Sequence, residues 1–192
     1  MINHFAATPL AIIDVETTGL NPRIERVIEI GILRVENGKV VKTLNTLINP
    51  VTYLPPFITE MTGIRNEELE RAPTFFDRYK EIFALLDGAL FVAHNANFDY
   101  SFMCQEFNRV GLNFEANTLC TVQLSRKVFP QHRTHNLGAI IERYGFSYKR
   151  RHRAYDDAAV LHKFLRMLGR KQHCDAAATA IRNFFPRINR AS

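Results

Sequence analysis

Residues 9–19 read PLAIIDVETTG, an apolar run of strand length that ends in two carboxylates and a turn-forming Thr-Thr-Gly. Asp14 and Glu16 are two residues apart, and in a β-strand residues two apart have side chains on the same face. Two such carboxylates repel each other unless a cation lies between them. The stretch therefore predicts a buried strand that carries a divalent-metal site at its carboxyl end. The alternative is a solvated strand end that begins a loop.

The sequence after this strand predicts a hairpin and then an alternation of strands and helices. Residues 26–35 alternate their larger apolar side chains, and Asn37-Gly38 is typical of a tight hairpin turn, so we expect a third strand over residues 40–48. Prolines at 50, 55 and 56 interrupt the next stretch. The later elements are expected as helix 74–86, strand 89–93, helix 97–110, strand 117–120, and helices 121–129, 135–144 and 154–169. This order predicts an α/β fold with a mixed sheet covered by helices.

The composition is that of a globular protein. The chain has 192 residues, 46% hydrophobic and 23% charged, which excludes a disordered, collagen-like or coiled-coil protein. No apolar run approaches the roughly 20 residues that span a bilayer, and the N-terminus lacks the basic region of a signal peptide. We therefore expect a cytoplasmic protein with no membrane partner. The three cysteines form no CxxC pair and are expected to be reduced thiols.

Basic residues outnumber acidic ones, 25 against 19, which favours a polyanionic partner such as nucleic acid. Four of the cations surround His152 in the run KRRHR at 149–153, directly before Asp156 and Asp157. A solvated basic loop followed by acids at a helix N-terminus is the simpler interpretation. It does not explain why a histidine lies five residues before Asp157.

Two further polar clusters contain histidine. The run HNANFD at 94–99 follows an expected strand, at the end where open α/β sheets bind ligands. Its alternative is plain helix capping by Asn95 or Asn97, with Asp99 complementing the helix dipole. The second cluster is the HxxH pair at 132 and 135, to which we assign no zinc. There we expect Thr134 to open a helix with His135 in its first turn.

The sequences DxETTG (14–19), HNANFD (94–99) and HxAxxDA (152–158) together resemble the three exonuclease motifs of the DEDDh branch of the DnaQ-like 3′–5′ exonuclease superfamily. The resemblance covers about residues 9–170, includes MTGI at 61–64, and is greatest to the proofreading epsilon subunits of bacterial DNA polymerase III. It implies a ribonuclease H-like fold, a mixed β-sheet flanked by α-helices. We expect an exonuclease domain over 1–172 and a C-terminal helical and basic extension over 173–192, with its helix ended by Pro186.

The resemblance implies a role for each residue of the three motifs. The acidic ligands of two divalent ions, Mg²⁺ or Mn²⁺, are Asp14, Glu16, Asp99 and Asp157, and the general base is His152. The related branch has a tyrosine four residues before the last aspartate, where this chain has Arg153. The implied contacts to the terminal nucleotide are Thr17, Thr18, Gly19, Met61, Thr62, His94 and Phe98, with core packing as the alternative for Met61 and Phe98. The candidate phosphate contacts are Arg150, Arg151 and Arg153.

The implied function is metal-dependent 3′–5′ hydrolysis of phosphodiester bonds at the 3′ ends of single-stranded or frayed DNA. A two-metal mechanism would release 5′-mononucleotides in proofreading or repair, with DNA polymerase III as a candidate partner. One alternative is an RNA-trimming exoribonuclease with the same site. Another is a non-catalytic nucleic-acid-binding module or replication-complex partner, against which the presence of all four acids and the histidine argues. The oligomeric state is left open.

Overall fold

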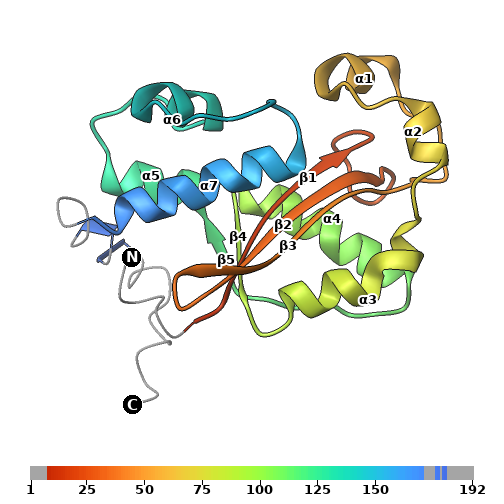
Figure 1. Ribbon diagram of the computed structural model, residues 1–192, viewed down its shortest axis with the longest axis horizontal. Coiled ribbons are helices and arrows are strands. Elements are labelled where there is room, and N and C mark those ends of the chain that lie inside the picture. The colour runs from red at the N-terminus through yellow and green to blue at the C-terminus, as the bar shows by residue number, and fades with distance from the viewer. Residues whose placement is uncertain (1–7, 171–175, 178, 181–192) are drawn as a thin grey trace.

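The computed structural model describes residues 8–170, 176–177 and 179–180, and its centre is one five-stranded sheet (Figure 1). The strand order is β3-β2-β1-β4-β5. β1 (Leu10–Thr17), β2 (Val27–Glu36) and β3 (Lys39–Leu47) form an antiparallel meander, while β4 (Leu90–Ala93) and β5 (Thr118–Cys120) continue the sheet parallel to β1. The helices are α1 (Pro56–Thr62), α2 (Asn66–Glu70), α3 (Phe75–Leu86), α4 (Ala96–Arg109), α5 (Thr121–Val128), α6 (Leu137–Tyr144) and α7 (Ala154–Leu168). The mixed sheet with flanking helices is confirmed.

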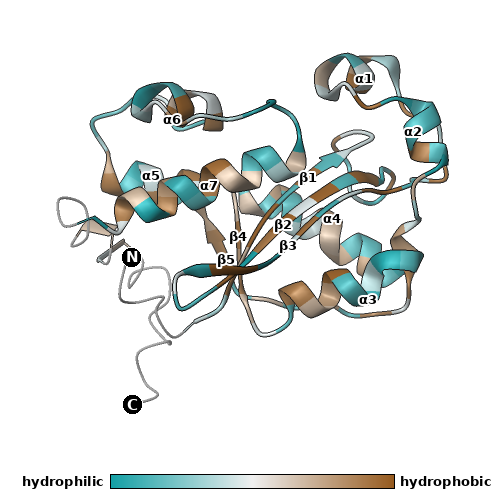
Figure 2. Ribbon diagram, in the orientation of Figure 1, coloured by the Kyte–Doolittle hydropathy of each residue, from teal (hydrophilic) through white to brown (hydrophobic). Residues whose placement is uncertain are grey.

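Alternation along β1 divides the protein into two apolar layers, visible as brown strands between helices in Figure 2. Leu10 and Ile12 pack in the core that α5, α6 and α7 cover, whereas Ala11 and Ile13 pack in the core beneath α3 and α4. Asp14 continues the period of Leu10 and Ile12, so its side chain leaves β1 on the α7 side of the sheet. The strand period thus fixes which helix lies over the first motif.

The hairpin turn is confirmed, and its backbone shows why these two residues form it. Asn37 and Gly38 have φ of 46° and 77°. Positive φ at both central residues is the geometry of the two-residue turns that match the twist of antiparallel strands. Asparagine and glycine adopt this region at the lowest cost.

Two short helices, α1 and α2, lie where the prolines predicted only an interruption. Pro56 occupies the first turn of α1, where a missing N–H costs nothing. Ile58 of α1 and Leu69 of α2 pack with Ile28 of β2 in a small separate core. The helices are seven and five residues long, too short for a periodic pattern to stand out.

One predicted helix start is wrong, and the capping alternative at another helix does not hold for Asn95. α6 begins at Leu137, with Asn136 rather than Thr134 as its cap, because the Asn136 side chain accepts from the Ala139 N–H at 2.8 Å. His135 lies before the helix, buried, with Nδ1 2.8 Å from Ser125 Oγ. At α4, Asn95 precedes the helix in the left-handed region with φ 68° and makes no capping bond through its side chain.

The predicted C-terminal helix, with its end at Pro186, lies largely outside the described residues. Of that stretch, 176–177 and 179–180 are described and helical, and Ala177 and Ala180 are buried in the core beneath α7. Cys104 and Cys120 are free thiols, and Cys174 is outside the described residues. No described helix combines the length and apolarity that crossing a bilayer requires.

Gly31 permits the close approach of α7 to the sheet. It pairs with Asp14 in the register of β1 and β2, and a Cβ placed on it would lie 2.3 Å from the Ala154 carbonyl carbon and from the Tyr155 nitrogen. Any side chain there therefore pushes the first turn of α7 away from β1. We expect Gly31→Ala to destabilise the fold by about 1–3 kcal/mol through overpacking and to lower activity as α7 shifts.

Urea denaturation measures this effect, and Gly111→Ala is the matched control. Gly111 has φ 77°, and a Cβ added to it would meet nothing within 4 Å, so its replacement costs only backbone strain of about 1 kcal/mol. The control should retain activity. Equal activity in the two variants would contradict the role of Gly31 in placing α7.

Candidate active site

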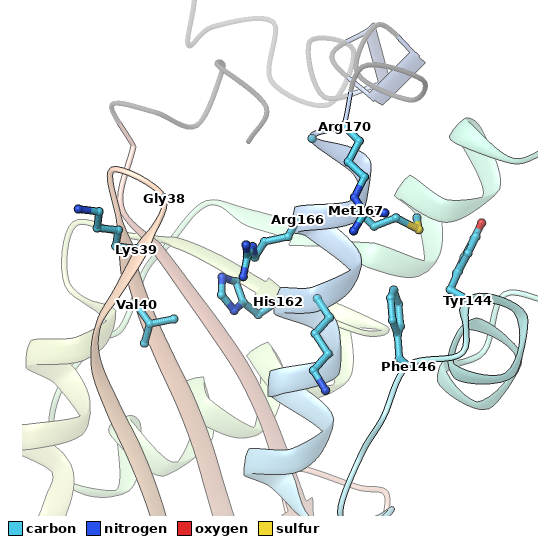
Figure 3. Close-up of a pocket in the computed structure, with 11 residues that line it drawn as sticks. Gly38, Lys39, Val40, Tyr144, Phe146, His162, Arg166, Met167 and Arg170 are labelled. Atoms are coloured by element: carbon cyan, nitrogen blue, oxygen red, sulfur yellow. The ribbon is translucent and has the colours of Figure 1, made fainter.

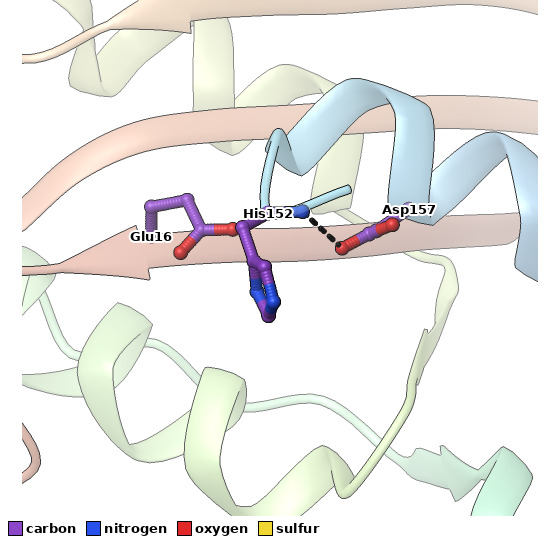
Figure 4. Close-up of side chains that lie close together, drawn as sticks. All are labelled: Glu16, His152 and Asp157. Atoms are coloured by element: carbon purple, nitrogen blue, oxygen red, sulfur yellow. Dashed lines mark hydrogen bonds between the residues drawn. The ribbon is translucent and has the colours of Figure 1, made fainter. Parts of the chain in front are cut away.

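Four carboxylates and one imidazole meet at the carboxyl end of β1. Asp14 and Glu16 come from β1, Asp99 from the first turn of α4, and Asp157 from the first turn of α7. One ligand atom each from Glu16, His152 and Asp157 lies within 4.8 Å of the others (Figure 4). Asp99 joins them because its Oδ1 accepts from the Val15 N–H at 3.1 Å. Asp14 is close enough to Asp99, Glu16 and Asp157 for their charges to raise its pKa, so the structure brings together all five residues assigned to catalysis from the sequence.

His152 is held by its backbone. Its N–H donates to Asp157 Oδ2 at 3.2 Å, the dashed line in Figure 4. Its φ is 55°, in the left-handed region that non-glycine residues adopt at a cost of order 1 kcal/mol or more. Such strain persists only where surrounding contacts enforce it. The imidazole itself is partly exposed, and one of its nitrogens lies within 4.8 Å of a carboxylate oxygen of Glu16 and of Asp157.

Glu29 is a further buried carboxylate beside the cluster, and the sequence reasoning missed it. Its side chain is 1% exposed, lies opposite Glu16 in the sheet register, and accepts from Arg153 Nη2 at 2.7 Å and Nε at 3.0 Å. It also accepts from the Ala154 N–H at 2.9 Å. Arg153 was predicted to contact phosphate, and this needs correction because two of its donors are committed to Glu29. The feature of the sequence that could have revealed Glu29 is a charged residue at an expected buried position of an apolar strand.

Burial raises the pKa of each of the four carboxyls. It is the main reason why the pKa of Glu16 and that of Asp99 rise to about 8 and that of Asp157 to about 6. The pKa of Asp14 is also well above its usual range, through burial and then repulsion by Asp99 and its other acidic neighbours. Without added positive charge, this cluster holds protons that ordinary carboxyls have lost at neutral pH.

The cluster has the chemistry of a divalent-cation site. Asp157 Oδ1 is buried and has no hydrogen-bond partner among the described residues. A buried polar atom without a partner calls for an unseen ligand, and carboxylate oxygens are what Mg²⁺ and Mn²⁺ prefer. A cation would also favour the charged forms that burial disfavours. The residues present therefore fit divalent metal.

These raised pKa values predict an unusual pH dependence for the metal-free fold. The folded protein binds the protons of Glu16, Asp99 and Asp157 more tightly than the unfolded chain, so protonation stabilises the fold. The stabilisation is complete below about pH 4 and is lost as pH rises through the folded-state values of about 6 to about 8. In EDTA we expect the free energy of unfolding to fall by about 2 kcal/mol or more between about pH 5 and pH 9.

Urea titrations in EDTA at several pH values test this expectation. In the double variant Glu16→Gln, Asp99→Asn the free energy of unfolding should change much less with pH, because these two side chains no longer bind or release a proton. Saturating Mg²⁺ should protect the wild type most at high pH, where metal does not compete with protons. A wild-type dependence as flat as that of the variant would contradict the raised pKa values.

The loop after β1 is fixed by the hydroxyls predicted to face the nucleotide. Thr17 Oγ1 donates to Gly19 O at 2.6 Å, and Thr18 Oγ1 donates to the Glu25 carboxylate and accepts from the Arg26 N–H. Both threonines are buried. Their side chains shape the loop, which leaves its backbone as the part that a ligand can approach.

The other predicted nucleotide contacts differ in exposure. Met61 is 45% exposed on α1, so the core-packing alternative for it is wrong. Thr62 is buried, and its hydroxyl donates to Ile58 O at 2.8 Å. Phe98 is half-buried, with its ring centroid 4.9 Å from that of Phe102. His94 Nδ1 lies 2.9 Å from Thr121 Oγ1, and burial lowers the His94 pKa to about 4, so the ring is neutral.

The two neighbouring aspartates at the start of α7 have different partners. Asp156 accepts from the Arg150 N–H at 3.1 Å through Oδ2, whereas Asp157 belongs to the carboxylate cluster. This supports the choice of Asp157 made from the motif spacing. Arg150 and Arg151 are both exposed, and the Arg151 guanidinium lies against Gly138 of α6.

Comparison with known proteins identifies the family. Residues 11–165 match the model of the RNase_T family, described as exonuclease. The chain belongs to this exonuclease family. The recognition of a DEDDh exonuclease from the three motifs is thereby confirmed, and the particular similarity to polymerase III epsilon subunits stays a prediction.

The curated relatives of this family member are much longer proteins. The chain is 39% identical over 151 residues to the 3′–5′ exonuclease DinG of Bacillus subtilis, which covers 78% of this chain and 16% of DinG. It is 35% identical over 162 residues to the PolC-type DNA polymerase III of Caldanaerobacter subterraneus, which covers 84% of this chain and 12% of PolC. The exonuclease chain therefore spans less than a fifth of either relative.

Solved structures share the exonuclease fold. E. coli exonuclease I, in complex with a dT13 oligonucleotide, has a TM-score of 0.76 at 14% identity over 86% of this chain and 42% of that one. A 3′-exonuclease that recognises a histone mRNA stem-loop has a TM-score of 0.73 at 18% identity over 91% of this chain and 67% of that one. At these identities the likeness establishes the fold alone.

Proposed function

We propose that this exonuclease is a metal-dependent 3′–5′ enzyme that removes 5′-mononucleotides from single-stranded or frayed DNA ends. The observation that carries the proposal is the meeting of three buried carboxylates, the half-buried Asp14 and His152 at one sheet end, with Asp157 Oδ1 left without a partner among the described residues. Charges buried at this density are destabilising unless they bind something. A catalytic metal site for phosphodiester hydrolysis accounts for all of them.

Each residue of the cluster has a proposed role in the mechanism. Asp14, Glu16, Asp99 and Asp157 hold two divalent ions, which when bound stabilise charge on the attacking and leaving oxygens. His152 takes the proton from the attacking water. Burial and the charge of Arg151 lower the pKa of its ring, which keeps the imidazole neutral and able to accept a proton near pH 7.

We propose that the Thr17–Gly19 loop, which directly follows Glu16, and α1 hold the terminal nucleotide. The loop offers backbone groups, because its hydroxyls are engaged within the loop. Met61 offers an exposed apolar side chain for the face of a base. Arg150 and Arg151 are exposed, and we propose that they contact phosphates of the strand.

The proposed base predicts a pH–rate profile. At saturating Mn²⁺, kcat should fall with decreasing pH through an ionisation below 6.5, because protonated His152 accepts no proton. His152→Ala should lower kcat by about 10²–10⁴-fold and lose that ionisation. Stopped-time assays between about pH 5 and pH 9 measure both profiles. Parallel profiles for the wild type and the variant would assign the ionisation to another group.

The preference for DNA and the role in proofreading or repair rest on the relatives. DinG is named as a 3′–5′ exonuclease and PolC as a DNA polymerase, and the exonuclease I neighbour is bound to a DNA oligonucleotide. These names support a DNA substrate and a replication polymerase as a candidate partner. The neighbour that recognises a histone mRNA stem-loop supports the second candidate, 3′–5′ trimming of RNA.

Product analysis tests the proposed function and its alternative together. Single-stranded dT20 and rU20 are incubated with the full chain in Mg²⁺, Mn²⁺ or EDTA, and mononucleotides are quantified by mass spectrometry. We expect 5′-mononucleotides with either metal, none in EDTA, none from Asp14→Ala, and faster release from DNA. Faster release from RNA would select the trimming function. Binding without release in either metal would support the non-catalytic module.

A further inference from the structure

A second recess lies along α7, on a side that the catalytic cluster does not use. Its larger part is a cavity of about 1060 Å³ between the β2–β3 turn, the end of α6 with Phe146, and the C-terminal half of α7 (Figure 3). A smaller part of about 500 Å³ is lined by Tyr148, Lys149 and Arg150. Lys163 lines both parts, so the two recesses adjoin along α7, and we name them together the α7 groove.

The α7 groove is strongly basic. Lys39, Lys163, Arg166 and Arg170 line its larger part, where no described lining residue is a carboxylate. The smaller part has Lys149, Arg150 and Lys163 against one carboxylate, Asp156, whose Oδ2 accepts from the Arg150 N–H. Neither Lys39, Arg166 nor Arg170 forms a salt bridge with a described residue. Positive charge gathered in a recess without acidic partners favours an anionic ligand.

Polar groups in the larger part also lack partners. His162 Nε2 and Tyr144 Oη are buried and form no hydrogen bond with the described residues. Lys163 is the exception, because its Nζ donates to Ser147 Oγ at 3.1 Å and to the Ser147 carbonyl, which fixes the loop onto α7. The groove therefore combines a fixed wall with free cations and unsatisfied polar atoms.

The α7 groove leads toward the active site. Arg150 in its smaller part is two residues from His152, and its N–H donates to Asp156, the neighbour of Asp157. Arg166 is nine residues along α7 from Asp157, about 14 Å at 1.5 Å per residue. Tyr148, 45% exposed, offers a ring between the two ends on which a base can stack.

We propose that the α7 groove binds the phosphate backbone of the substrate strand upstream of the 3′-terminal nucleotides. This inference rests on the proposed function, since it extends the same substrate beyond the cleaved bond. The charge complementarity, the aromatic ring and the continuity with the active site favour a single strand over an acidic protein or an anionic membrane. The groove then confers affinity on long strands and none on short ones.

The test compares a groove variant with a matched control. The groove variant is Lys39→Gln, Arg166→Gln, Arg170→Gln. The control is Arg71→Gln, Lys80→Gln, Arg126→Gln, which removes the same charge from exposed residues just after α2, in α3 and in α5. Binding of 5′-fluorescein dT20 and dT3 to the full-length chain in EDTA is followed by anisotropy at several salt concentrations. Cleavage of dT3 in Mg²⁺ is measured in parallel.

We expect the groove variant to bind dT20 at least about tenfold more weakly than the wild type and to lose about two from the salt slope, three contacts at roughly 0.7 each. The control should change dT20 affinity by no more than about threefold, and dT3 cleavage should be alike in all three proteins. Equal weakening in both variants, or none in either, would overturn the proposal. Binding of the same proteins to phosphatidylserine vesicles is measured as well. A groove variant that binds dT20 like the wild type but no longer binds these vesicles would also overturn the proposal. If the wild-type chain binds dT20 but does not cleave dT3, the proposed function is contradicted. The comparison of dT20 binding between the groove variant and the control still tests the groove.

Discussion

Replacing Asp157 by asparagine is expected to lower the rate of hydrolysis by about 10³-fold or more while leaving the fold intact. The replacement keeps the shape of the side chain and an oxygen that accepts from the His152 N–H. It removes the negative charge whose second oxygen is buried without a partner among the described residues. Because burial raises the pKa of Asp157 to about 6, the neutral side chain costs the metal-free fold nothing near neutral pH.

Asp156→Asn is the matched control for this variant. It changes the adjacent aspartate in the same turn of α7, and that residue binds the Arg150 N–H rather than joining the cluster. We expect its activity to stay within about threefold of the wild type, since the half-buried Asp156 lies outside the carboxylate cluster and asparagine keeps an oxygen that accepts from the Arg150 N–H. Turnover is measured as mononucleotide release, and folding by thermal denaturation. Asp157→Asn with more than a tenth of wild-type turnover would contradict its role as a ligand.

Arg153→Met is expected to be the most destabilising single change in the region, by about 3–5 kcal/mol. The Glu29 side chain is 1% exposed and is neutralised by the Arg153 guanidinium. Without it a buried carboxylate stays unpaired against Glu16 and Asp157, both of which it already repels. The double variant Glu29→Gln, Arg153→Met should recover much of the loss, because it removes the unpaired charge.

Arg78→Met supplies the comparison for this prediction. Arg78 pairs with Glu81 at 2.7 Å, but both side chains are more than a third exposed, so its loss should cost less than about 1 kcal/mol. Urea denaturation of the four proteins gives the energies. A similar loss of unfolding free energy in Arg153→Met and Arg78→Met would contradict the prediction that the buried pair of Glu29 and Arg153 contributes more to stability than an exposed pair.

The sequence carries the parts of the fold that depend on local periods. Alternation along β1 places Asp14 on the same face as Ile12, and the Asn37-Gly38 pair sets the return of the chain into β3. The helical period of α7 buries one face, with Asp157 in its first turn. From these periods the mixed sheet could be predicted, whereas the meeting of the catalytic residues was implied by the resemblance of the three motifs to those of DEDDh exonucleases.

Contacts between distant segments could not be predicted in the same way. Glu29 and Arg153 are 124 residues apart, and no local pattern joins them. The requirement for glycine at position 31 arises from the backbone of α7, which reaches it only in the folded protein. The hydroxyls of Thr17 and Thr18 were interpreted as ligand contacts, whereas three-dimensional packing commits them to the loop itself.

The most direct test of the account is the polarity of strand shortening. A 5′-labelled DNA strand with a free 3′-hydroxyl and the same strand with its 3′ end blocked are incubated with the chain in Mg²⁺ or in EDTA. Denaturing gels then show where the strand is cut. The account predicts a ladder that shortens from the 3′ end only with the free end and only with metal. Internal cuts, equal degradation of the blocked strand, or shortening in EDTA would contradict it.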